Sequence, residues 1–288
     1  MCKKMVEAVL VTGASGFIGR QTVSSLEKAG LHVIRGVRRP EGEGGLSNFV
    51  KIDLNDPSQI LSLKDNLRCD AIVHLGALVG LTGETDAELF VPNVLSTGCI
   101  ACLAKYWDAH LVFASTAMVH GMNAERIQVG SPLNPDTPYG RSKMLAEQLL
   151  QASGVKCCIL RIAGVFGLNG PDHLGLNRAI ASALHGKPPV QIGSGQALRN
   201  YVYVKDVAEI ITYAIKMDLT GVHLVAGHQL TSVSQMLQLV CDTYLPGKQP
   251  FIIDGPEATD QIVTPSTALP KTRSFHDALI DIQEEFSF

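Results

Sequence analysis

The stretch that decides the fold is Val6-Glu7-Ala8-Val9-Leu10-Val11-Thr12-Gly13-Ala14-Ser15-Gly16-Phe17-Ile18-Gly19. An apolar run leads into a loop with regularly spaced glycines, and an amphipathic segment follows, which predicts a strand, a tight loop and a helix. Gly13 supplies the positive φ of a sharp turn, Gly16 lets a pyrophosphate approach the backbone, and Gly19 lets the helix pack closely on the sheet. The free N–H groups at the helix start form an anion site. The stretch therefore predicts a dinucleotide-binding fold; a glycine turn that binds nothing would not need this spacing.

Composition limits the classes of function. The chain has 288 residues, of which 46% are hydrophobic, so its length predicts one large domain with a smaller one. Its 24 basic and 27 acidic residues give a net charge of −3, which is not the electrostatic pattern of a nucleic-acid-binding protein. No apolar run approaches the roughly 20 residues that span a bilayer. We therefore expect a cytoplasmic protein without nucleic-acid or membrane partners.

The cysteines predict neither a disulfide framework nor a metal site. The chain has seven cysteines, an odd number, so reduced thiols are expected. Cys99 and Cys102 form a C-x-x-C pair inside an apolar helical stretch, but no second pair stands at metal-binding spacing. We interpret both as small apolar side chains of a core, and we expect no bound metal.

Apolar strands alternate with helical patterns over most of the chain. This alternation predicts an α/β fold, a Rossmann-type doubly wound parallel sheet with a smaller C-terminal α/β substrate-binding region. We expect the NAD(P)-binding domain over residues 1–166 and the smaller region over residues 167–288, with residues 200–225 returning to the first domain. After the glycine loop, strands are expected at 31–37, 50–54, 71–77 and 110–116, and helices at about 86–106 and from 138.

The end of the second strand bears on the choice of cofactor. In this fold an acidic residue about 20 positions after the glycines binds the adenosine ribose of NAD. Here the sequence is Arg35-Gly36-Val37-Arg38-Arg39, and no acid is present. Arg38 and Arg39 suit a 2′-phosphate, so NADP is favoured over NAD; the alternative is that both arginines are solvated loop cations.

Other candidate contacts of the cofactor lie at the ends of later strands. Asp53 is placed either to accept from the adenine amino group or to cap the helix after Pro57, whereas His74 is interpreted as a packed strand residue. Asn93 lies inside a predicted helix, where asparagine is unfavourable, which indicates a specific hydrogen bond. The residues expected to bind the cofactor are Gly13, Ser15, Gly16, Phe17, Ile18, Gly19, Arg38, Arg39, Asp53, Leu54, Leu75, Gly76, Ala77, Asn93, Ser115, Tyr139 and Lys143.

A tyrosine and a lysine one helical turn apart form the candidate catalytic pair. Thr137 and Pro138 predict a helix start, which places Tyr139 and Lys143 on one helical face. A lysine cation beside a phenol favours the phenolate, so we expect the pKa of Tyr139 to lie below its usual value of about 10. Such a tyrosine exchanges a proton with a hydroxyl as hydride leaves or enters its carbon. Thr116, at the end of the fifth strand, is placed to hold the same oxygen.

The same spacing occurs once more in a different context. Tyr244 and Lys248 are also four residues apart, but Pro246 and Gly247 lie between them. Because proline and glycine end a helix, these two side chains are not expected to share a face. Helical context therefore separates the candidate pair from this one.

The motifs together resemble one family. From residue 6 to about 225 the chain resembles the extended short-chain dehydrogenase/reductases of the NAD-dependent epimerase/dehydratase family. The glycine loop matches the family's TGxxGxxG, and Tyr139 and Lys143 match its YxxxK. Residues 160–167 resemble its LRxxNVYG segment, with Gly164 in place of Asn.

The resemblance implies a nucleotide-sugar epimerase or 4-ketoreductase that uses NAD or NADP. Its catalytic residues would be Thr116, Tyr139 and Lys143. In the family's 4,6-dehydratases an Asp–Glu pair follows the catalytic hydroxyl, but Ala117 and Met118 stand at those positions here. Dehydration is therefore not expected.

The resemblance also implies substrate contacts and an assembly. Arg199 would grip the diphosphate of the nucleotide sugar, the alternative being a salt bridge between domains. His173 is either a second acid or base or a surface histidine. A homodimer is implied, through a bundle of the helix near 86–106 and the helix of Tyr139. The residues expected to bind substrate are Thr116, His173, Asn177 and Arg199.

Two other functions remain as alternatives. One is an NADPH-dependent reductase of a non-sugar carbonyl compound, against which Arg199 argues if it binds a diphosphate. The other is a dinucleotide-sensing protein without turnover, against which the complete set of Thr116, Tyr139 and Lys143 argues.

Overall fold

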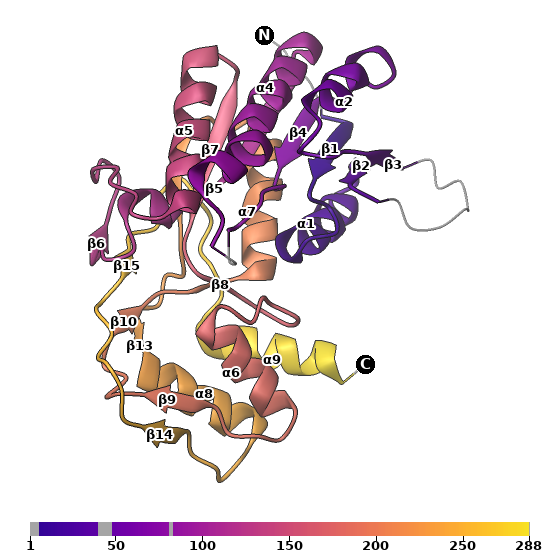
Figure 1. Cartoon of the computed structure of the whole chain (residues 1–288). Helices are drawn as coiled ribbons and strands as arrows, with labels where there is room; N and C mark the ends of the chain where they lie inside the picture. Colours follow the sequence, from indigo (N-terminus) through magenta and orange to yellow (C-terminus); the bar gives the residue numbers. More distant parts are fainter. Residues whose placement is uncertain (1–5, 40–47, 81–82, 288) are drawn as a thin grey trace. The chain divides into compact units, whose positions relative to one another are not determined.

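A computed structural model describes residues 6–39, 48–80 and 83–287 (Figure 1). The chain divides into two compact units. Unit 1 comprises Met1–Met122, Pro132–Arg161 and Val207–His223, and unit 2 comprises Asn123–Ser131, Ile162–Asp206 and Leu224–Phe288. The division after Arg161 lies five residues before the expected boundary at 166, and residues 207–223 return to unit 1.

A seven-stranded sheet forms the centre of unit 1, with the order β12-β7-β5-β4-β1-β2-β3. The strand pairs from β5 to β3 are parallel. The chain therefore builds outward from β1 in one direction and then in the other, which is the switch point of a doubly wound fold. The strands are β1 (Ala8–Thr12), β2 (His32–Val37), β3 (Phe49–Lys51), β4 (Ala71–His74), β5 (His110–Thr116), β7 (Cys157–Ile162) and β12 (Gly221–Val225).

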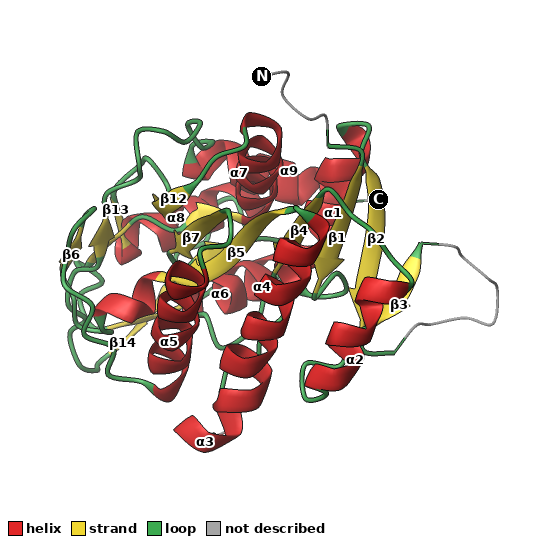
Figure 2. Cartoon of the chain, turned by 90° about the horizontal axis from the view of Figure 1, so that it is seen from above, coloured by secondary structure: helices red, strands yellow, loops and turns green. Residues whose placement is uncertain are grey.

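Helices cover both faces of this sheet (Figure 2). The helices α2, α4 and α5 pack on one face, and α1 and α7 lie on the other, where Ser25 of α1 hydrogen-bonds Thr212 of α7. The helical elements are α1 (Phe17–Lys28), α2 (Pro57–Ser62), η1 (Leu63–Asp65), α3 (Asp86–Leu89), η2 (Phe90–Leu95), α4 (Ser96–Trp107), η3 (Ala117–His120), α5 (Pro138–Ser153) and α7 (Val204–Met217).

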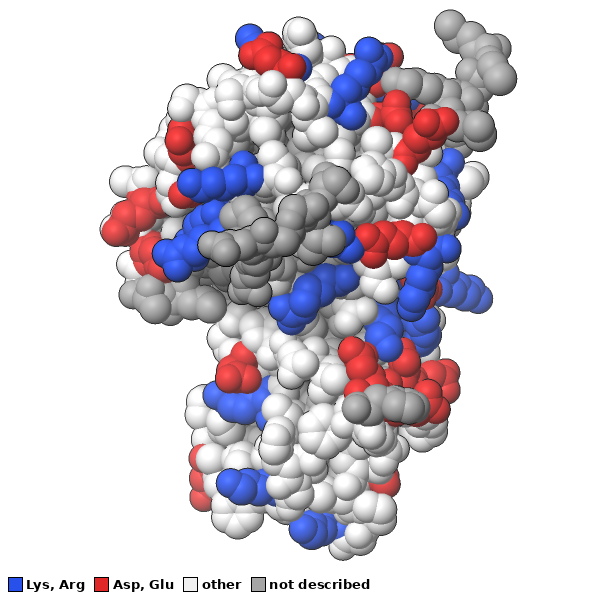
Figure 3. All heavy atoms as spheres, turned by 90° about the vertical axis from the view of Figure 1, so that its right-hand side faces the viewer, with Lys and Arg blue, Asp and Glu red and all other residues white. Residues whose placement is uncertain are grey.

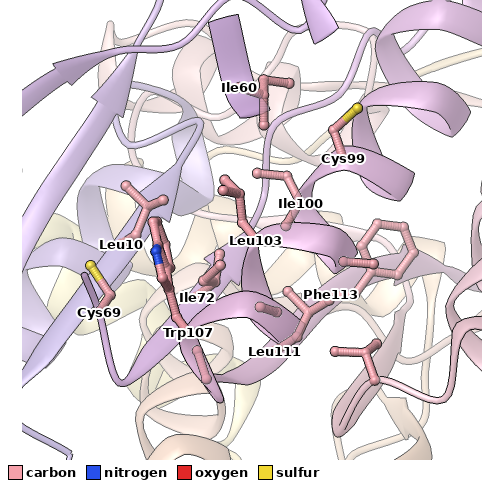
Figure 4. Close-up of a cluster of buried hydrophobic side chains, with 14 of the residues drawn as sticks. Leu10, Ile60, Cys69, Ile72, Cys99, Ile100, Leu103, Trp107, Leu111 and Phe113 are labelled. Atoms are coloured by element: carbon pink, nitrogen blue, oxygen red, sulfur yellow. The ribbon is translucent and has the colours of Figure 1, made fainter. Parts of the chain in front are cut away.

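A hydrophobic core lies between the sheet and the helices α2, α4 and α5 (Figure 4). Leu10, Ile72 and Phe113 contribute from the strands, and Ile100 and Trp107 contribute from α4. Because parallel strands are buried on both faces, their sequences are continuously apolar, as the strand patterns predicted.

Helix α5 begins as its sequence predicts. The Thr137 hydroxyl accepts a hydrogen bond of 3.0 Å from the Gly140 N–H, and Pro138 occupies the first helical position. Gly154 ends the helix in a left-handed conformation. These signals fix which side chains of α5 are buried and therefore position Tyr139 and Lys143.

The elements α3, η2 and α4 form one helical stretch, Asp86–Trp107. By length and composition alone this stretch could cross a membrane, although no sufficiently apolar run was expected. In its most apolar window, 61% of the residues are buried inside the protein. A helix that packs on a sheet carries such a composition for its core contacts.

Unit 2 consists of short two-stranded pairings with three helices. The pairings are β10 with β13, β11 with β8, β14 with β9, and β15 with β6. The elements are β6 (Arg126–Ile127), β8 (Val165–Phe166), α6 (Gly175–Leu184), β9 (Val190–Ile192), β10 (Leu198–Arg199), β11 (Val202–Tyr203), β13 (Thr231–Ser232), α8 (Val233–Tyr244), β14 (Phe251–Ile253), β15 (Ile262–Val263) and α9 (Phe275–Phe286).

The glycine that replaces the family's asparagine has a structural reason in unit 2. A Cβ atom on Gly164 would lie 2.4 Å from Cε1 of Tyr201. The tyrosine ring therefore fills the space into which an asparagine side chain would extend. A side chain at residue 164 would therefore require the Tyr201 ring to move.

Candidate functional site

The glycine loop after β1 has the geometry of an anion site. Gly13 has a φ of +67°, and Gly16 is the N-cap of α1 with no side chain bonded to the first helical N–H groups. A Cβ atom on Gly19 would lie 2.1 Å from the carbonyl oxygen of Gly13. The third glycine therefore lets α1 start against the loop's own backbone, and the helix N-terminus stays free for a phosphate.

A cleft of about 790 Å³ opens at the carboxyl ends of β1, β2 and β4. Parallel register brings Thr12, His74 and Phe113 into line across β1, β4 and β5, so the residues after them lie along one sheet edge. This is where ligands bind in open α/β sheets. The cleft is lined by Gly13, Ser15, Arg20, Gly36, Val37, Arg38, Arg39, Phe49, Ile52, Asp53, Leu54, Asn55, Gly76, Ala77, Leu78 and Pro92.

A series of buried hydrogen bonds around His74 joins β1, β4 and α4 at this edge of the sheet. Thr97 donates to the Asn93 carbonyl at 2.6 Å, so its oxygen accepts from His74 Nε2 at 3.1 Å. His74 Nδ1 then accepts from the Thr12 hydroxyl at 2.6 Å, and Thr12 accepts from the Gly76 N–H at 3.2 Å. Burial lowers the pKa of His74 to about 3, so the ring is neutral. His74 is a packed strand residue, as expected.

Three arginines line the cleft. Arg38 and Arg39 follow β2 and are exposed. Arg20, on α1, donates to the Ser15 carbonyl at 2.8 Å and was not singled out from the sequence. The sequence feature that could have identified Arg20 as a cleft residue is its position directly after Gly19, the third glycine of the loop. On the face drawn in Figure 3, basic and acidic side chains are interspersed.

Two predicted cofactor residues have hydrogen bonds within the protein. Asp53 accepts from the Asn55 N–H at 3.0 Å, and the cap of α2 is Asp56, which accepts from the Gln59 N–H at 3.2 Å. Of the two roles considered for Asp53, helix capping is therefore wrong, and Asp53 lines the cleft. The Asn93 amide bonds both the N–H and the carbonyl of Leu78, each at 2.8 Å, which is the specific bonding expected of it.

The candidate catalytic side chains come from β5 and α5. Lys143 is 2% exposed and donates from Nζ to the Ala114 carbonyl at 2.8 Å. Its Nζ lies 4.5 Å from the centre of the Phe113 ring and 6.0 Å from the centre of the Tyr139 ring. The buried Thr116 hydroxyl accepts from the Met118 N–H at 3.2 Å. Lys143 thus reaches the strand that ends in Thr116, and the Tyr139 ring lies near Lys143. The residues that line the cleft do not include Thr116, Tyr139 or Lys143.

The pKa of Tyr139 differs from the value expected beside Lys143. Burial raises the pKa of Tyr139 to about 12, so the lowered value predicted from Lys143 is wrong for this structure. Burial also lowers the pKa of Lys143 to about 7, against a smaller opposing effect of Glu147. Removal from water disfavours both the phenolate and the ammonium ion, and this outweighs their mutual attraction at the observed separation.

Ser115, Glu147, Arg161 and His120 form a network beneath this site, and of these Glu147 was not singled out by the sequence patterns. The Ser115 hydroxyl, expected at the cofactor, donates to the Glu147 carboxylate. Glu147 is also bonded to Arg161, which in turn contacts His120. The sequence feature that could have identified Glu147 is its position one helical turn after Lys143, on the same face of the predicted helix.

The predicted substrate residues of unit 2 have different surroundings. Arg199 donates to the carbonyls of Leu198, at 2.9 Å, and Thr259. Asn177 is buried: it accepts from the Gly167 N–H at 3.1 Å and donates to the Val165 carbonyl at 3.2 Å, so it holds the loop before α6. His173, in that loop, is exposed.

Among the residues described, no group of histidine, cysteine and acidic side chains is arranged to hold a metal ion. The six cysteines within these residues are free. Cys99 is buried, as expected, whereas the interpretation of Cys102 as a core side chain is wrong, because its side chain is exposed.

Tyr244 and Lys248 do not lie on one helix, as expected. Helix α8 ends at Tyr244, so Lys248 lies beyond it. The Tyr244 hydroxyl donates to the Leu279 carbonyl at 2.8 Å.

A family model and known relatives both match this chain over most of its length. A family model described as "NAD dependent epimerase/dehydratase family" matches residues 9–227. A UDP-glucose epimerase of Bacillus subtilis, described as uncharacterized, is 28% identical over 256 residues, or 81% of each chain.

Solved structures also match. The UDP-glucose 4-epimerase of Thermus thermophilus, in complex with NAD, has a TM-score of 0.81 and 25% identity, covering 97% of this chain and 98% of the other. The UDP-glucose 4-epimerase of Thermotoga maritima, with UDP-glucose, shares the fold with a TM-score of 0.83 and 22% identity over 97% of this chain and 98% of the other.

Proposed function

The chain belongs to the NAD-dependent epimerase/dehydratase family, and on this premise we propose that it transfers hydride between NAD(P) and a carbinol or ketone carbon of a nucleotide sugar. It is an enzyme of the extended short-chain dehydrogenase/reductase type. The observation that supports the proposal is that Lys143 bonds the Ala114 carbonyl of β5, the strand that ends in Thr116, and that β5 lies in parallel register, through β4, with the strand that leads into the glycine loop.

Each residue has a role in this chemistry. The nicotinamide would accept or supply the hydride. Tyr139 exchanges the proton of the sugar hydroxyl, and Thr116 holds the same oxygen by a hydrogen bond. Lys143, as the ammonium ion, stabilises the phenolate, which offsets part of the cost of burial. The glycine loop and the start of α1 bind the pyrophosphate.

A nucleotide-sugar 4-epimerase is the function that we favour. Relatives of this chain are described as UDP-glucose 4-epimerases, including one from Lactobacillus helveticus that is 29% identical over 72% of each chain. Ala117 and Met118 cannot protonate a leaving hydroxyl, which argues against dehydration. Thermal-shift screening of nucleotide sugars with NAD or NADP tests this choice. Stabilisation by UDP-hexoses together with a nicotinamide cofactor supports it, and no response to any nucleotide sugar contradicts it.

A 4-ketoreductase that uses NADPH is the second candidate, because Arg20, Arg38 and Arg39 line the cleft. If Arg38 and Arg39 bind a 2′-phosphate, we expect the double variant Arg38→Ala/Arg39→Ala to raise the Kd of NADPH by roughly 10- to 100-fold and to leave that of NADH unchanged. Fluorescence titration measures both constants. Equal effects on the two cofactors would exclude the 2′-phosphate contact.

Arg199 is proposed to bind the diphosphate of the substrate. We expect Arg199→Ala to raise KM for the nucleotide sugar by roughly 10- to 100-fold, because hydrogen bonds to charged groups contribute about 1.5–3 kcal/mol. The exposed Arg126 of the same unit provides a control, and Arg126→Ala should leave KM unchanged. An unchanged KM in Arg199→Ala would contradict the assignment, and the melting temperature separates loss of binding from loss of fold.

The homodimer is also a proposal. It is supported by exposed apolar side chains on the helical elements 86–107 and on α5, among which Tyr106 is 67% exposed and Leu95 and Leu145 are each 42% exposed. Sedimentation of the purified protein tests it, since a monomer would contradict it.

A further inference from the structure

A buried carboxylate lies beneath the candidate catalytic residues. Glu147 is 1% exposed and stands one helical turn after Lys143 on α5. Its carboxylate accepts from Arg161 of β7 at 3.1 Å from Nε and 2.7 Å from Nη2. It also accepts from the Ser115 hydroxyl of β5. One side chain therefore joins α5, β5 and β7.

The other end of the network is a neutral histidine. Arg161 Nη1 lies 3.3 Å from His120 Nε2, and His120 Nδ1 lies 2.9 Å from the Pro132 carbonyl. These contacts require Nδ1 to donate and Nε2 to accept, because arginine and a carbonyl leave no other assignment. Burial lowers the pKa of His120, which agrees with a neutral ring. The network thus has one negative charge, on Glu147, and one positive charge, on Arg161.

Few charged groups near Lys143 stabilise its ammonium form. Its Nζ donates to a backbone carbonyl, and among the described residues no acid forms an ion pair with it. The titratable groups around it are Tyr139 and Glu147 on its own helix, His74 from β4, and Arg161 and His120 beyond Glu147. Glu147 is the acid among these groups.

We propose that Glu147 is a positioning residue of the Thr116, Tyr139 and Lys143 site, which clamps α5 to β5 through Ser115 and places a buried carboxylate one helical turn from Lys143. The proposal rests on the function proposed above. Ser115 directly precedes Thr116, and Lys143 bonds the carbonyl of Ala114, so two polar contacts align the helix that carries the phenol with the strand that carries the hydroxyl.

The electrostatic part follows from the burial of the amine. Burial lowers the pKa of Lys143 to about 7, and the Glu147 charge acts in the opposite direction. Arg161 compensates the carboxylate, which allows the charge to remain buried. Without Glu147, Lys143 would lose its proton at a lower pH, and a neutral amine no longer stabilises the phenolate.

The test is the titration of Lys143 in Glu147→Gln, which keeps the shape of the side chain and removes its charge. The full-length protein is labelled with ¹³C at lysine Cε, and the Lys143 resonance is assigned by its loss in Lys143→Arg. We expect the titration midpoint to fall by about one pH unit relative to the unmodified protein. The alkaline limit of kcat should move to lower pH by a similar amount, with a smaller change in KM.

Two further variants separate charge from structure. In Glu147→Met/Arg161→Met an apolar pair replaces the buried ion pair, a change that buried cores often tolerate, so this variant serves if Glu147→Gln does not fold. It should lower the Lys143 midpoint as well. Ser115→Ala removes one hydrogen bond but no charge, and it should leave the midpoint unchanged.

The outcomes distinguish this proposal from the proposed function. An unchanged Lys143 midpoint in both Glu147 variants would overturn the proposal, even if the enzyme acts on nucleotide sugars. A lowered midpoint in a protein that turns over no nucleotide sugar would support the effect of Glu147 on Lys143 and would contradict the proposed function instead.

Discussion

Tyr139→Phe is expected to lower kcat by about 10²- to 10⁴-fold, which is the range that a positioned general acid or base contributes. The substitution removes the hydroxyl that exchanges the substrate proton and keeps the ring that packs near Lys143. The affinity for the dinucleotide should change little, because the glycine loop and the start of α1 provide the phosphate contacts. Steady-state turnover of a nucleotide sugar and fluorescence titration of the cofactor measure the two quantities.

The second tyrosine–lysine pair provides the matched control for this variant. Tyr244→Phe also removes one phenolic hydroxyl, which donates to the Leu279 carbonyl in unit 2. We expect full activity and a loss of about 1 kcal/mol in the free energy of unfolding. Equal activity of the Tyr139 variant and the Tyr244 variant would contradict the role of Tyr139.

Gly19→Ala is expected to abolish most dinucleotide binding. The added Cβ would lie 2.1 Å from the Gly13 carbonyl and 2.9 Å from two atoms of Ala14, so the loop and the first turn of α1 have to separate. Overpacking against rigid neighbours costs about 3 kcal/mol or more, which corresponds to roughly a 100-fold rise in the Kd of NAD if the loop moves. Calorimetric titration with NAD and thermal unfolding measure the loss of binding and the loss of stability.

Gly30→Ala is the control for backbone effects in the same unit. Gly30 has a φ of +81°, but no atom lies within 4 Å of the position of its Cβ. The substitution should cost about 1–2 kcal/mol of stability through backbone strain and leave the Kd of NAD unchanged. If Gly19→Ala binds NAD as the unmodified protein does, the close approach of α1 to the loop is not what forms the site.

Local signals were sufficient for the elements that carry the site. The strand His110–Thr116 and the start of α5 at Pro138 have the expected bounds, because an apolar run and a capped first turn are encoded within a few residues. The third strand is Phe49–Lys51 rather than a strand continuing to Leu54. It forms one edge of the sheet, where pairing with a single neighbour limits its length.

Long-range contacts could not be inferred from local pattern. Glu147 and Arg161 are 14 residues apart and meet only because α5 packs on the sheet. The pKa values of Tyr139 and Lys143 depend on burial, which spacing does not specify. Arg20 belongs to the cleft because the turn of α1 after Gly19 brings it there.

The most direct test is to load the purified protein with NAD or NADP, add UDP-hexoses, and follow the fluorescence of reduced nicotinamide. We predict that at least one UDP-hexose produces this signal in the unmodified protein, and that Tyr139→Phe with bound cofactor does not. Binding of the cofactor without reduced nicotinamide, for every nucleotide sugar supplied and also for the reverse reaction from NAD(P)H and a keto sugar, would contradict the proposed hydride transfer.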